Sequence, residues 1–180
     1  MKNIFFKTAL GLLCFLISCK VPSDRISESF QTSQAKKNIA KEHAILKGIE
    51  TGDLSGLDTI IIDPYLDYNS GEKPIARDSI KKILMKIHEN VPDIKFSILA
   101  ESATADNMFY LVRATGRTIA PAMGWPANTE IDVTAVGFVK VKNGMFVEHQ
   151  GFYSPRDILK MDSLNKASTL KPNKGTSKRK

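Results

Sequence analysis

The chain has 180 residues, a formal net charge of +7, 42% hydrophobic residues and two cysteines. This length fits one domain of ordinary size with a real core and is too short for two comfortable ones. The positive charge lies at the ends, because Lys2 and Lys7 stand at the start and residues 166–180 hold six Lys and Arg and no acidic residue. Subtracting these eight charges leaves −1 on residues 19–165, so we expect no nucleic-acid partner.

The first 18 residues resemble a bacterial lipoprotein signal peptide. Lys2 and Lys7 give a positive start, residues 8–18 are apolar or small, and a Leu-Ile-Ser-Cys lipobox ends at Cys19. The apolar run falls short of the roughly 20 residues that a helix needs to cross a bilayer. The resemblance implies that residues 1–18 are removed and that Cys19 becomes the lipidated first residue of an envelope protein, attached to the membrane through its lipid.

Both ends of the mature chain are predicted to lack a packed core. Residues 19–33 are polar and rich in serine and would tether the lipid to the domain, while residues 163–180 form a basic, disordered tail. Lys20, which follows the lipidated cysteine in place of an aspartate, favours the outer membrane by analogy with known sorting behaviour. A single domain is therefore expected at residues 34–162.

The first part of this domain has helical periodicity. Apolar residues recur at helical spacing over residues 35–49, and the Thr-Gly-Asp sequence at 51–53 ends this helix. A short turn of helix follows at residues 53–57. A third helix has Asp78 as its predicted cap, carries one apolar stripe and ends before Pro92.

Beyond Pro92 the apolar residues alternate with a period of two, which is typical of strands. The predicted strands cover residues 94–103, 108–118, 129–141 and 145–153. Asn143-Gly144 supplies the positive backbone angles of a tight hairpin turn, and Ser154 with Pro155 begins a terminal helix. Helices followed by consecutive antiparallel strands predict an α+β fold, with the helices covering one face of a curved antiparallel sheet of about four main strands.

Several short stretches stand at particular places in this pattern: Gly52–Leu57, Tyr65–Asn69, Val91–Ile94, Gly116–Thr118, Trp125–Asn128 and Lys142–His149. Their order over residues 34–162 resembles the SnoaL-like (polyketide cyclase-like) branch of the nuclear transport factor 2-like superfamily. The resemblance implies a cone, in which a strongly curved sheet encloses a pocket and the helices close its wide end. Such folds serve enzymes, small-molecule binders and dimerisation modules, so the fold alone does not give an activity.

The resemblance also implies which residues face the pocket. It places Tyr65, Asp67 and Tyr68 there, together with one face of the last strand. Alternation puts His149 and Tyr153 on one face of that strand and Glu148 and Phe152 on the other. Tyrosines in such positions offer an aromatic wall and a hydroxyl group, which suits binding better than strong base catalysis.

Cyclase-type relatives use a carboxylate on or just after the last strand to take a proton next to a carbonyl group. This chain has no Asp or Glu between His149 and Arg156, and Gln150 and Ser154 stand where relatives often carry tryptophan and aspartate. His149 is the remaining candidate for a general base, because imidazole titrates near neutral pH. The alternative is a strand histidine held by a structural hydrogen bond at the sheet edge.

Two further residues are candidates for the pocket wall. Arg113 would need an acidic or anionic partner if it were buried, and would otherwise lie exposed on the outer face of the sheet. Trp125 belongs to the unusually apolar connection at residues 120–126. It would either plug the cone or form a rim that touches an apolar ligand.

No metal site and no cofactor are predicted. The three histidines, His43, His88 and His149, are far apart in the sequence and lack metal-ligand spacing. Removal of the signal peptide would take away Cys14, and Cys19 would carry lipid. His43 lies on the apolar stripe of the first helix, where we expect a partly buried, hydrogen-bonded histidine.

Three hypotheses follow for function. The first is a lipid-anchored envelope protein whose pocket binds a small, mostly apolar molecule, with no evident catalysis. The second is a cyclase or isomerase in which His149 is the general base and Tyr68, Tyr153 or Glu148 orients a carbonyl substrate. The third is a noncatalytic interaction module that forms a homodimer through the open face of its sheet.

Overall fold

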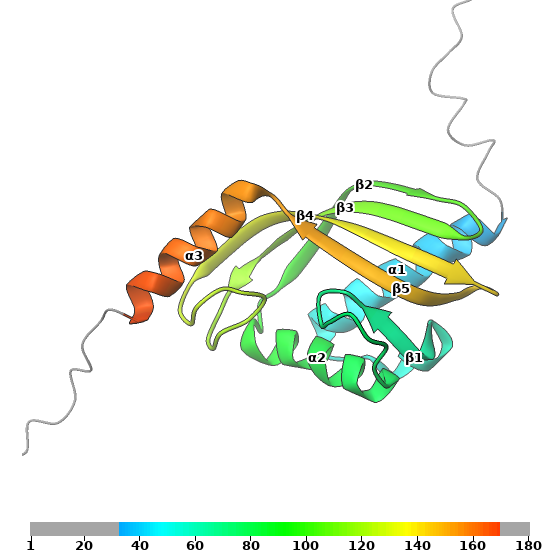
Figure 1. The fold of residues 1–180 in the computed structure, drawn as a ribbon, viewed down its shortest axis with the longest axis horizontal. Coiled ribbons are helices and arrows are strands. Elements are labelled where there is room, and N and C mark those ends of the chain that lie inside the picture. Colours follow the sequence, from blue (N-terminus) through cyan, green and yellow to red (C-terminus); the bar gives the residue numbers. More distant parts are fainter. Residues whose placement is uncertain (1–32, 170–180) are drawn as a thin grey trace, which may run out of the picture. The chain divides into compact units, whose positions relative to one another are not determined.

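The computed structural model describes residues 33–169 as helices packed on one mixed sheet, so the predicted α+β fold is confirmed (Figure 1). Its elements are α1 (Ser33–Thr51), the 3-10 helix η2 (Ser55–Thr59), β1 (Ile61–Asp67), α2 (Arg77–Asn90), β2 (Lys95–Ala103), β3 (Asn107–Arg117), β4 (Glu130–Lys142), β5 (Met145–Tyr153) and α3 (Pro155–Thr169). The predicted signal peptide, Cys19, nearly all of the predicted tether and residues 170–180 lie outside the described residues.

The sheet has five strands in the order β1-β5-β4-β3-β2, one more than the sequence predicts. Neighbouring strands are antiparallel except β1, which pairs with β5 in parallel. Pro64 breaks the apolar run of β1, and a proline within such a run argues against a strand. The pairing is allowed because β1 is an edge strand of the sheet. Proline has no N–H group, and at the edge this does not remove a hydrogen bond between two inner strands.

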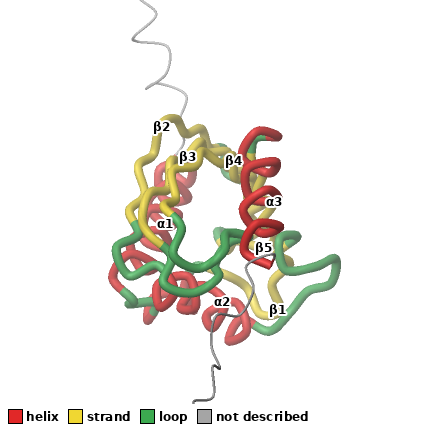
Figure 2. The backbone as a smooth tube through the Cα atoms, turned by 90° about the vertical axis from the view of Figure 1, so that its left-hand side faces the viewer, coloured by secondary structure: helices red, strands yellow, loops and turns green. Residues whose placement is uncertain are grey.

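Two helices lie across the concave side of the sheet. Helix α1 packs against β2 and β3, and α2 packs against α1 and β1. Figure 2 shows the strands curving over α1, with α2 below them and α3 standing on the opposite side. Buried apolar side chains form two clusters, one around Leu57, Ile80 and Phe146 and one around Ile94 and Trp125.

Polar side chains fix the rotation of α1 about its own axis. The buried Asn38 amide donates hydrogen bonds to the carbonyl groups of Thr104 (2.9 Å) and Ala105 (3.2 Å) in the β2–β3 turn. At the other end of the helix, the Glu50 carboxylate accepts a hydrogen bond of 2.8 Å from the Phe96 N–H group. Since these residues stand on the face of α1 that meets the sheet, they determine which side chains of α1 point inward.

Of the two helix caps predicted from the sequence, one is confirmed and the other is wrong. The Ser154 hydroxyl accepts a hydrogen bond of 3.1 Å from the Asp157 N–H group, so the predicted cap of the last helix is confirmed. The prediction of Asp78 as a cap is wrong, because Asp78 lies inside the first turn of α2. The Arg77 N–H group instead donates to the carboxylate of Asp63 at 3.2 Å.

Helix α3 runs to Thr169, beyond the predicted domain boundary at residue 162, so residues 163–169 are helical. Met161 is buried beside the connection between β3 and β4, and the Asn165 amide donates to the Gly124 carbonyl group at 2.8 Å. No helix within residues 33–169 is both long enough and apolar enough to span a membrane.

Candidate functional site

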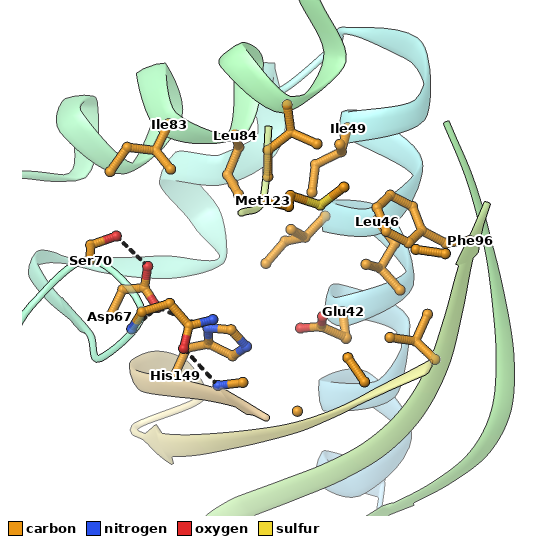
Figure 3. A pocket seen from close by; sticks show the side chains of 18 of the residues that line it. Glu42, Leu46, Ile49, Asp67, Ser70, Ile83, Leu84, Phe96, Met123 and His149 are labelled. Carbon is orange, nitrogen blue, oxygen red and sulfur yellow. Dashed lines mark hydrogen bonds and ion pairs between the residues drawn. The ribbon is translucent and has the colours of Figure 1, made fainter. Parts of the chain in front are cut away.

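The concave side of the sheet and helices α1 and α2 enclose a cavity of about 630 Å³, a volume typical of small-molecule sites (Figure 3). Most of its wall is apolar, with the larger side chains drawn from Ile45, Leu46, Ile49, Ile61, Ile80, Ile83, Leu84, Ile87, Phe96, Val112 and Met123. Its polar groups are Glu42, Tyr65, Asp67, Asn69, Ser70, Tyr110, His149 and Tyr153. The cavity therefore suits an apolar molecule that presents a few polar atoms.

The pairing of β1 with β5 places a carboxylate beside the histidine of the cavity. Asp67 and His149 are register partners in the two parallel strands, and the Tyr68 N–H group donates to the His149 carbonyl group at 3.0 Å. The two side chains meet through Nδ1 of His149 and Oδ1 of Asp67, which are 3.0 Å apart. A histidine and a carboxylate so paired are typical of an oriented acid–base group.

Asp67 is held in the ionised form by its hydrogen bonds. Burial alone would raise the pKa of the Asp67 carboxyl group, but hydrogen bonds from His149, the Ser70 hydroxyl (2.6 Å) and the Asn69 N–H group (3.3 Å) lower it overall. An ionised carboxylate accepts the proton on Nδ1 of His149. When Nδ1 donates its proton to Asp67, Nε2 is left as the ring nitrogen that faces the cavity.

Tyr110, on β3, reaches His149 across the intervening strand. Its hydroxyl oxygen lies 3.1 Å from Nε2 of His149, and the two rings are nearly parallel, with an interplanar angle of 7°. Burial, followed by the nearby Glu42, raises the pKa of Tyr110 well above its ordinary value, so Tyr110 stays a phenol and can donate to Nε2.

A pair of glycines makes room for this arrangement. Gly137 on β4 and Gly151 on β5 are register partners. A Cβ atom on Gly137 would lie 2.0 Å from Cζ of Tyr110, and one on Gly151 would lie 2.6 Å from the Asn69 amide nitrogen. The Tyr110 ring and the Asn69 amide therefore occupy the space above two positions that carry no side chain.

Glu42, like Tyr110, is a site residue that was not predicted from the sequence. It lies on the inward face of α1 and is only 4% exposed, and Figure 3 shows its carboxyl group pointing toward His149. Burial raises the pKa of Glu42, although the charge of His149 and a hydrogen bond with Tyr110 oppose this shift. A signal was present in the sequence, since Glu42 is spaced by four from Asn38 and from Leu46 on the buried stripe.

Four predicted site residues lie on the cavity wall: Tyr65, Asp67, His149 and Tyr153. Burial and the Glu42 charge raise the pKa of Tyr65 well above its ordinary value, and burial raises that of Tyr153, so both remain neutral phenols. His149 meets the geometric condition for a general base, because it faces the cavity within hydrogen-bond reach of a second polar group.

Three other predicted pocket residues lie elsewhere. Tyr68 is 43% exposed because it follows the end of β1, where the chain turns away from the sheet. Arg113 is exposed on the outer face and forms two hydrogen bonds of 2.7 Å with Asp132, its diagonal neighbour on β4. Trp125 is 1% exposed and packs in the second core cluster, so its indole fills the core and is absent from the cavity wall.

His43 also differs from its expected place. The contacts of Asn38 and Glu50 orient α1 so that Glu42 faces the cavity, and the next residue, His43, therefore points outward. Nε2 of His43 lies 2.7 Å from a carboxylate oxygen of Glu101. Among residues 33–169, no group of three or more His, Cys, Asp or Glu residues could hold a metal ion.

The fold and this cavity define a small α+β domain with a largely apolar cavity between its sheet and its helices. Residues 42–160 match the family profile of the SnoaL-like polyketide cyclases. The chain therefore belongs to this family, whose fold is that of the nuclear transport factor 2-like superfamily. A search of curated proteins found no significant match.

Solved structures with the same fold share little sequence with this chain. A SnoaL-like polyketide cyclase homologue from Jannaschia sp. CCS1 has 14% identity and a TM-score of 0.61, covering 73% of this chain and 94% of its own. TsrD from Streptomyces laurentii has 17% identity and a TM-score of 0.61, with coverages of 72% and 94%. An epoxide hydrolase of the LEH-like type from M. tuberculosis has 14% identity and a TM-score of 0.55, with coverages of 76% and 98%.

The close approach of Tyr110 to Gly137 gives a testable consequence. In a Gly137→Ala variant the new methyl group would overlap the Tyr110 ring, so we expect a loss of about 1 to 3 kcal/mol in the free energy of unfolding, measured with urea. Gly56→Ala is the matched control, because no atom lies within 4 Å of its added carbon, and its stability should change by less than about 0.5 kcal/mol. Equal effects of the two changes would contradict this account of the glycine.

Proposed function

We propose that this protein is an acid–base enzyme of the cyclase or isomerase type that acts on a small, mostly apolar carbonyl compound. The observation that carries this proposal is the Asp67–His149 pair, whose Nδ1–Oδ1 distance is 3.0 Å within a largely apolar cavity. We propose catalysis and not simple binding because a carboxylate is hydrogen-bonded to the histidine. This carboxylate belongs to Asp67 at the end of β1, and not to the region after β5.

The pair is arranged for proton transfer. Asp67 fixes the imidazole orientation and stabilises the imidazolium that forms when Nε2 takes a proton. The Tyr110 hydroxyl, 3.1 Å from Nε2, is a second protic group at the same place. A base and a hydrogen-bond donor side by side suit the removal of a proton next to a carbonyl group, since the donor stabilises the oxyanion that develops.

The cavity wall supports a neutral and mainly apolar substrate. Its apolar side chains come from both helices and from the sheet, and no Lys or Arg is among its lining residues in the described part of the chain. An anionic substrate would be desolvated there without a cationic partner. An uncharged ring system with a carbonyl group has the chemistry that this wall and these polar groups would recognise.

A simple ketone tests the proposed reaction. We expect the purified full-length protein to accelerate exchange of the α-protons of 1-tetralone in deuterated buffer, followed by proton NMR. His149→Gln and Asp67→Asn should each lower the accelerated rate by about 10²- to 10⁴-fold, because each removes general-base catalysis. Because the pKa of Asp67 is lowered, this carboxyl group stays ionised down through the ordinary carboxyl range, so a loss of rate above that range would come from another group.

The chain contains a matched control for this experiment. His43 and Glu101 form a histidine–carboxylate pair of similar geometry, with a distance of 2.7 Å, but they lie outside the cavity. His43→Gln should therefore leave the exchange rate unchanged. The proposal would be rejected if both histidine variants behaved alike, or if the wild-type protein exchanged 1-tetralone no faster than buffer does.

The N-terminal motif supports a second part of the proposal, that Cys19 carries lipid and anchors the domain to the cell envelope, with Lys20 favouring the outer membrane. The support is the basic start, the short apolar run and the Leu-Ile-Ser-Cys sequence. A Cys19→Ser variant expressed in a bacterial host should leave the membrane fraction and lose incorporation of labelled palmitate. A serine variant that still sediments with the membranes would contradict lipid anchoring through this residue.

A homodimer is a second candidate, favoured by exposed apolar side chains on the outer face of the sheet. Phe109 is 53% exposed there, and its ring centroid lies 4.7 Å from that of Phe138 on the next strand. Light scattering of the full chain should give twice the monomer mass, and Phe109→Glu should restore the monomer. Ile119→Glu, which changes an exposed apolar residue outside the strands, is the control. A wild-type monomer at high concentration would exclude the dimer.

A further inference from the structure

The carboxyl group of Glu42 has no part in the reaction as described so far, although it is the most deeply buried acidic group of the cavity wall. Ionisable groups are rarely kept in an apolar interior unless they are paired or used. Glu42 comes from α1, whereas Asp67 and His149 come from the edge of the sheet. The two carboxyl groups therefore approach the histidine from different walls of the cavity.

We propose that Glu42 is the catalytic acid of the site and gives its proton to the carbonyl oxygen of the substrate while His149 takes a proton from the adjacent carbon. This inference rests on the proposed function and deepens it, because it assigns the acid and defines the substrate as an enolisable ketone or aldehyde. Figure 3 shows Glu42 and His149 facing each other across the cavity, as a bifunctional pair requires.

The surroundings of Glu42 favour the protonated carboxyl group. The titratable groups that face it are Tyr65 from β1, Tyr110 from β3 and His149 from β5, with His43 nearby on α1. The two tyrosines remain neutral phenols, and His149 already has an ionised carboxylate in Asp67. Burial therefore dominates at Glu42 and raises its pKa, and a neutral carboxylic acid in an apolar site can donate a hydrogen bond.

The proposed step is balanced within the substrate and the two residues. As the α-carbon loses its proton to Nε2 of His149, the electrons of the C–H bond form the C=C bond of an enol. The electrons of the carbonyl π bond move to oxygen, which takes the Glu42 proton. The site is left with an imidazolium at His149 and a carboxylate at Glu42, and no oxidant or other reactant is needed.

Tyr110 provides a path that restores the starting state. A phenol can accept one proton and donate another, and its hydroxyl group touches both Nε2 of His149 and the Glu42 carboxyl group. The proton on Nε2 passes to the Tyr110 oxygen as the Tyr110 proton passes to Glu42. During the reaction the hydroxyl group turns toward Glu42 and leaves Nε2 to the substrate, so Tyr110 acts as a positioning and relay residue.

Infrared spectroscopy of the full-length protein, without substrate, tests the protonation state directly. We expect the C=O stretch of a protonated carboxyl group near neutral pH, lost in Glu42→Gln and retained in Glu101→Gln, which removes a carboxylate that lies outside the cavity. Transfer into deuterated buffer should shift this band more slowly in Tyr110→Phe, because the relay is broken. Absence of the band in the wild type, or its persistence in Glu42→Gln, would overturn the proposal.

Bound 1-tetralone tests the role in the reaction. Its ketone stretch should move to lower frequency in the wild type and not in Glu42→Gln, and Glu42→Gln should slow α-proton exchange by about 10²- to 10³-fold. If Glu42→Gln does not fold, wild-type protein labelled with ¹³C at glutamate carboxyl groups gives the protonation state from its carboxyl shift as pH is varied. A fully ionised set of labelled carboxylates near neutral pH would then reject the proposal.

The two proposals fail in different ways. A carboxyl band that depends on Glu42, in a protein that does not exchange 1-tetralone, rejects the proposed reaction and leaves Glu42 protonated without a catalytic role. An exchange rate that depends on His149 but not on Glu42 rejects the catalytic acid alone. Loss of exchange in both variants, with the band lost only in Glu42→Gln, supports both proposals.

Discussion

The parallel pairing of β1 with β5 is the constraint on which the site depends. Without β1, His149 would stand on an edge strand, and its Nδ1 atom would face solvent. The same ladder that joins the two strands places Asp67 beside His149 and continues to Ile61, which pairs with Phe146 in the core. The orientation of the histidine is therefore tied to the packing of the core, and it does not depend on a flexible loop.

The two histidine–carboxylate pairs described here consist of similar residues and differ in their environment. His43 and Glu101 lie at the surface, where water and salt weaken their interaction. His149 and Asp67 border an apolar cavity, where hydrogen bonds fix both groups and neighbouring charges act more strongly. Glu42 adds a second carboxyl group in that medium. Two carboxyl groups with opposite pKa shifts are a combination that acid–base sites use.

Much of the fold could be predicted because most elements carry a clear period. Helices α1 and α2 and the four long strands match stretches in which apolar residues repeat at helical or strand spacing, and α3 begins at the cap predicted at Ser154. Strand β1 could not be found in this way, because Pro64 interrupts it and its pairing with β5 is distant in sequence. The fifth strand and the mixed sheet therefore needed the three-dimensional structure.

The site was harder to predict than the fold because it depends on register and rotation. His149, Tyr65 and Tyr153 follow from strand alternation and family resemblance. The position of Tyr110 depends on Gly137, its register partner on the next strand, which leaves room for the tyrosine ring. The register of β3 and β4 could not be predicted from the sequence. Glu42 was not predicted, although its spacing from Asn38 and Leu46 places it on the buried stripe of α1.

The carboxylate beside His149 comes from a different strand than the resemblance implies. Ser154 follows β5 where an aspartate is often found, and it keeps only the structural part of that role, because its hydroxyl group caps α3 by accepting from Asp157. The carboxylate that pairs with His149 is instead Asp67, at the end of β1. Since β1 and β5 are neighbours in the sheet, the carboxylate still lies beside His149. Catalytic groups are recognised by their geometry and not by their order in the chain, so one sheet can obtain the same acid–base pair from a different strand.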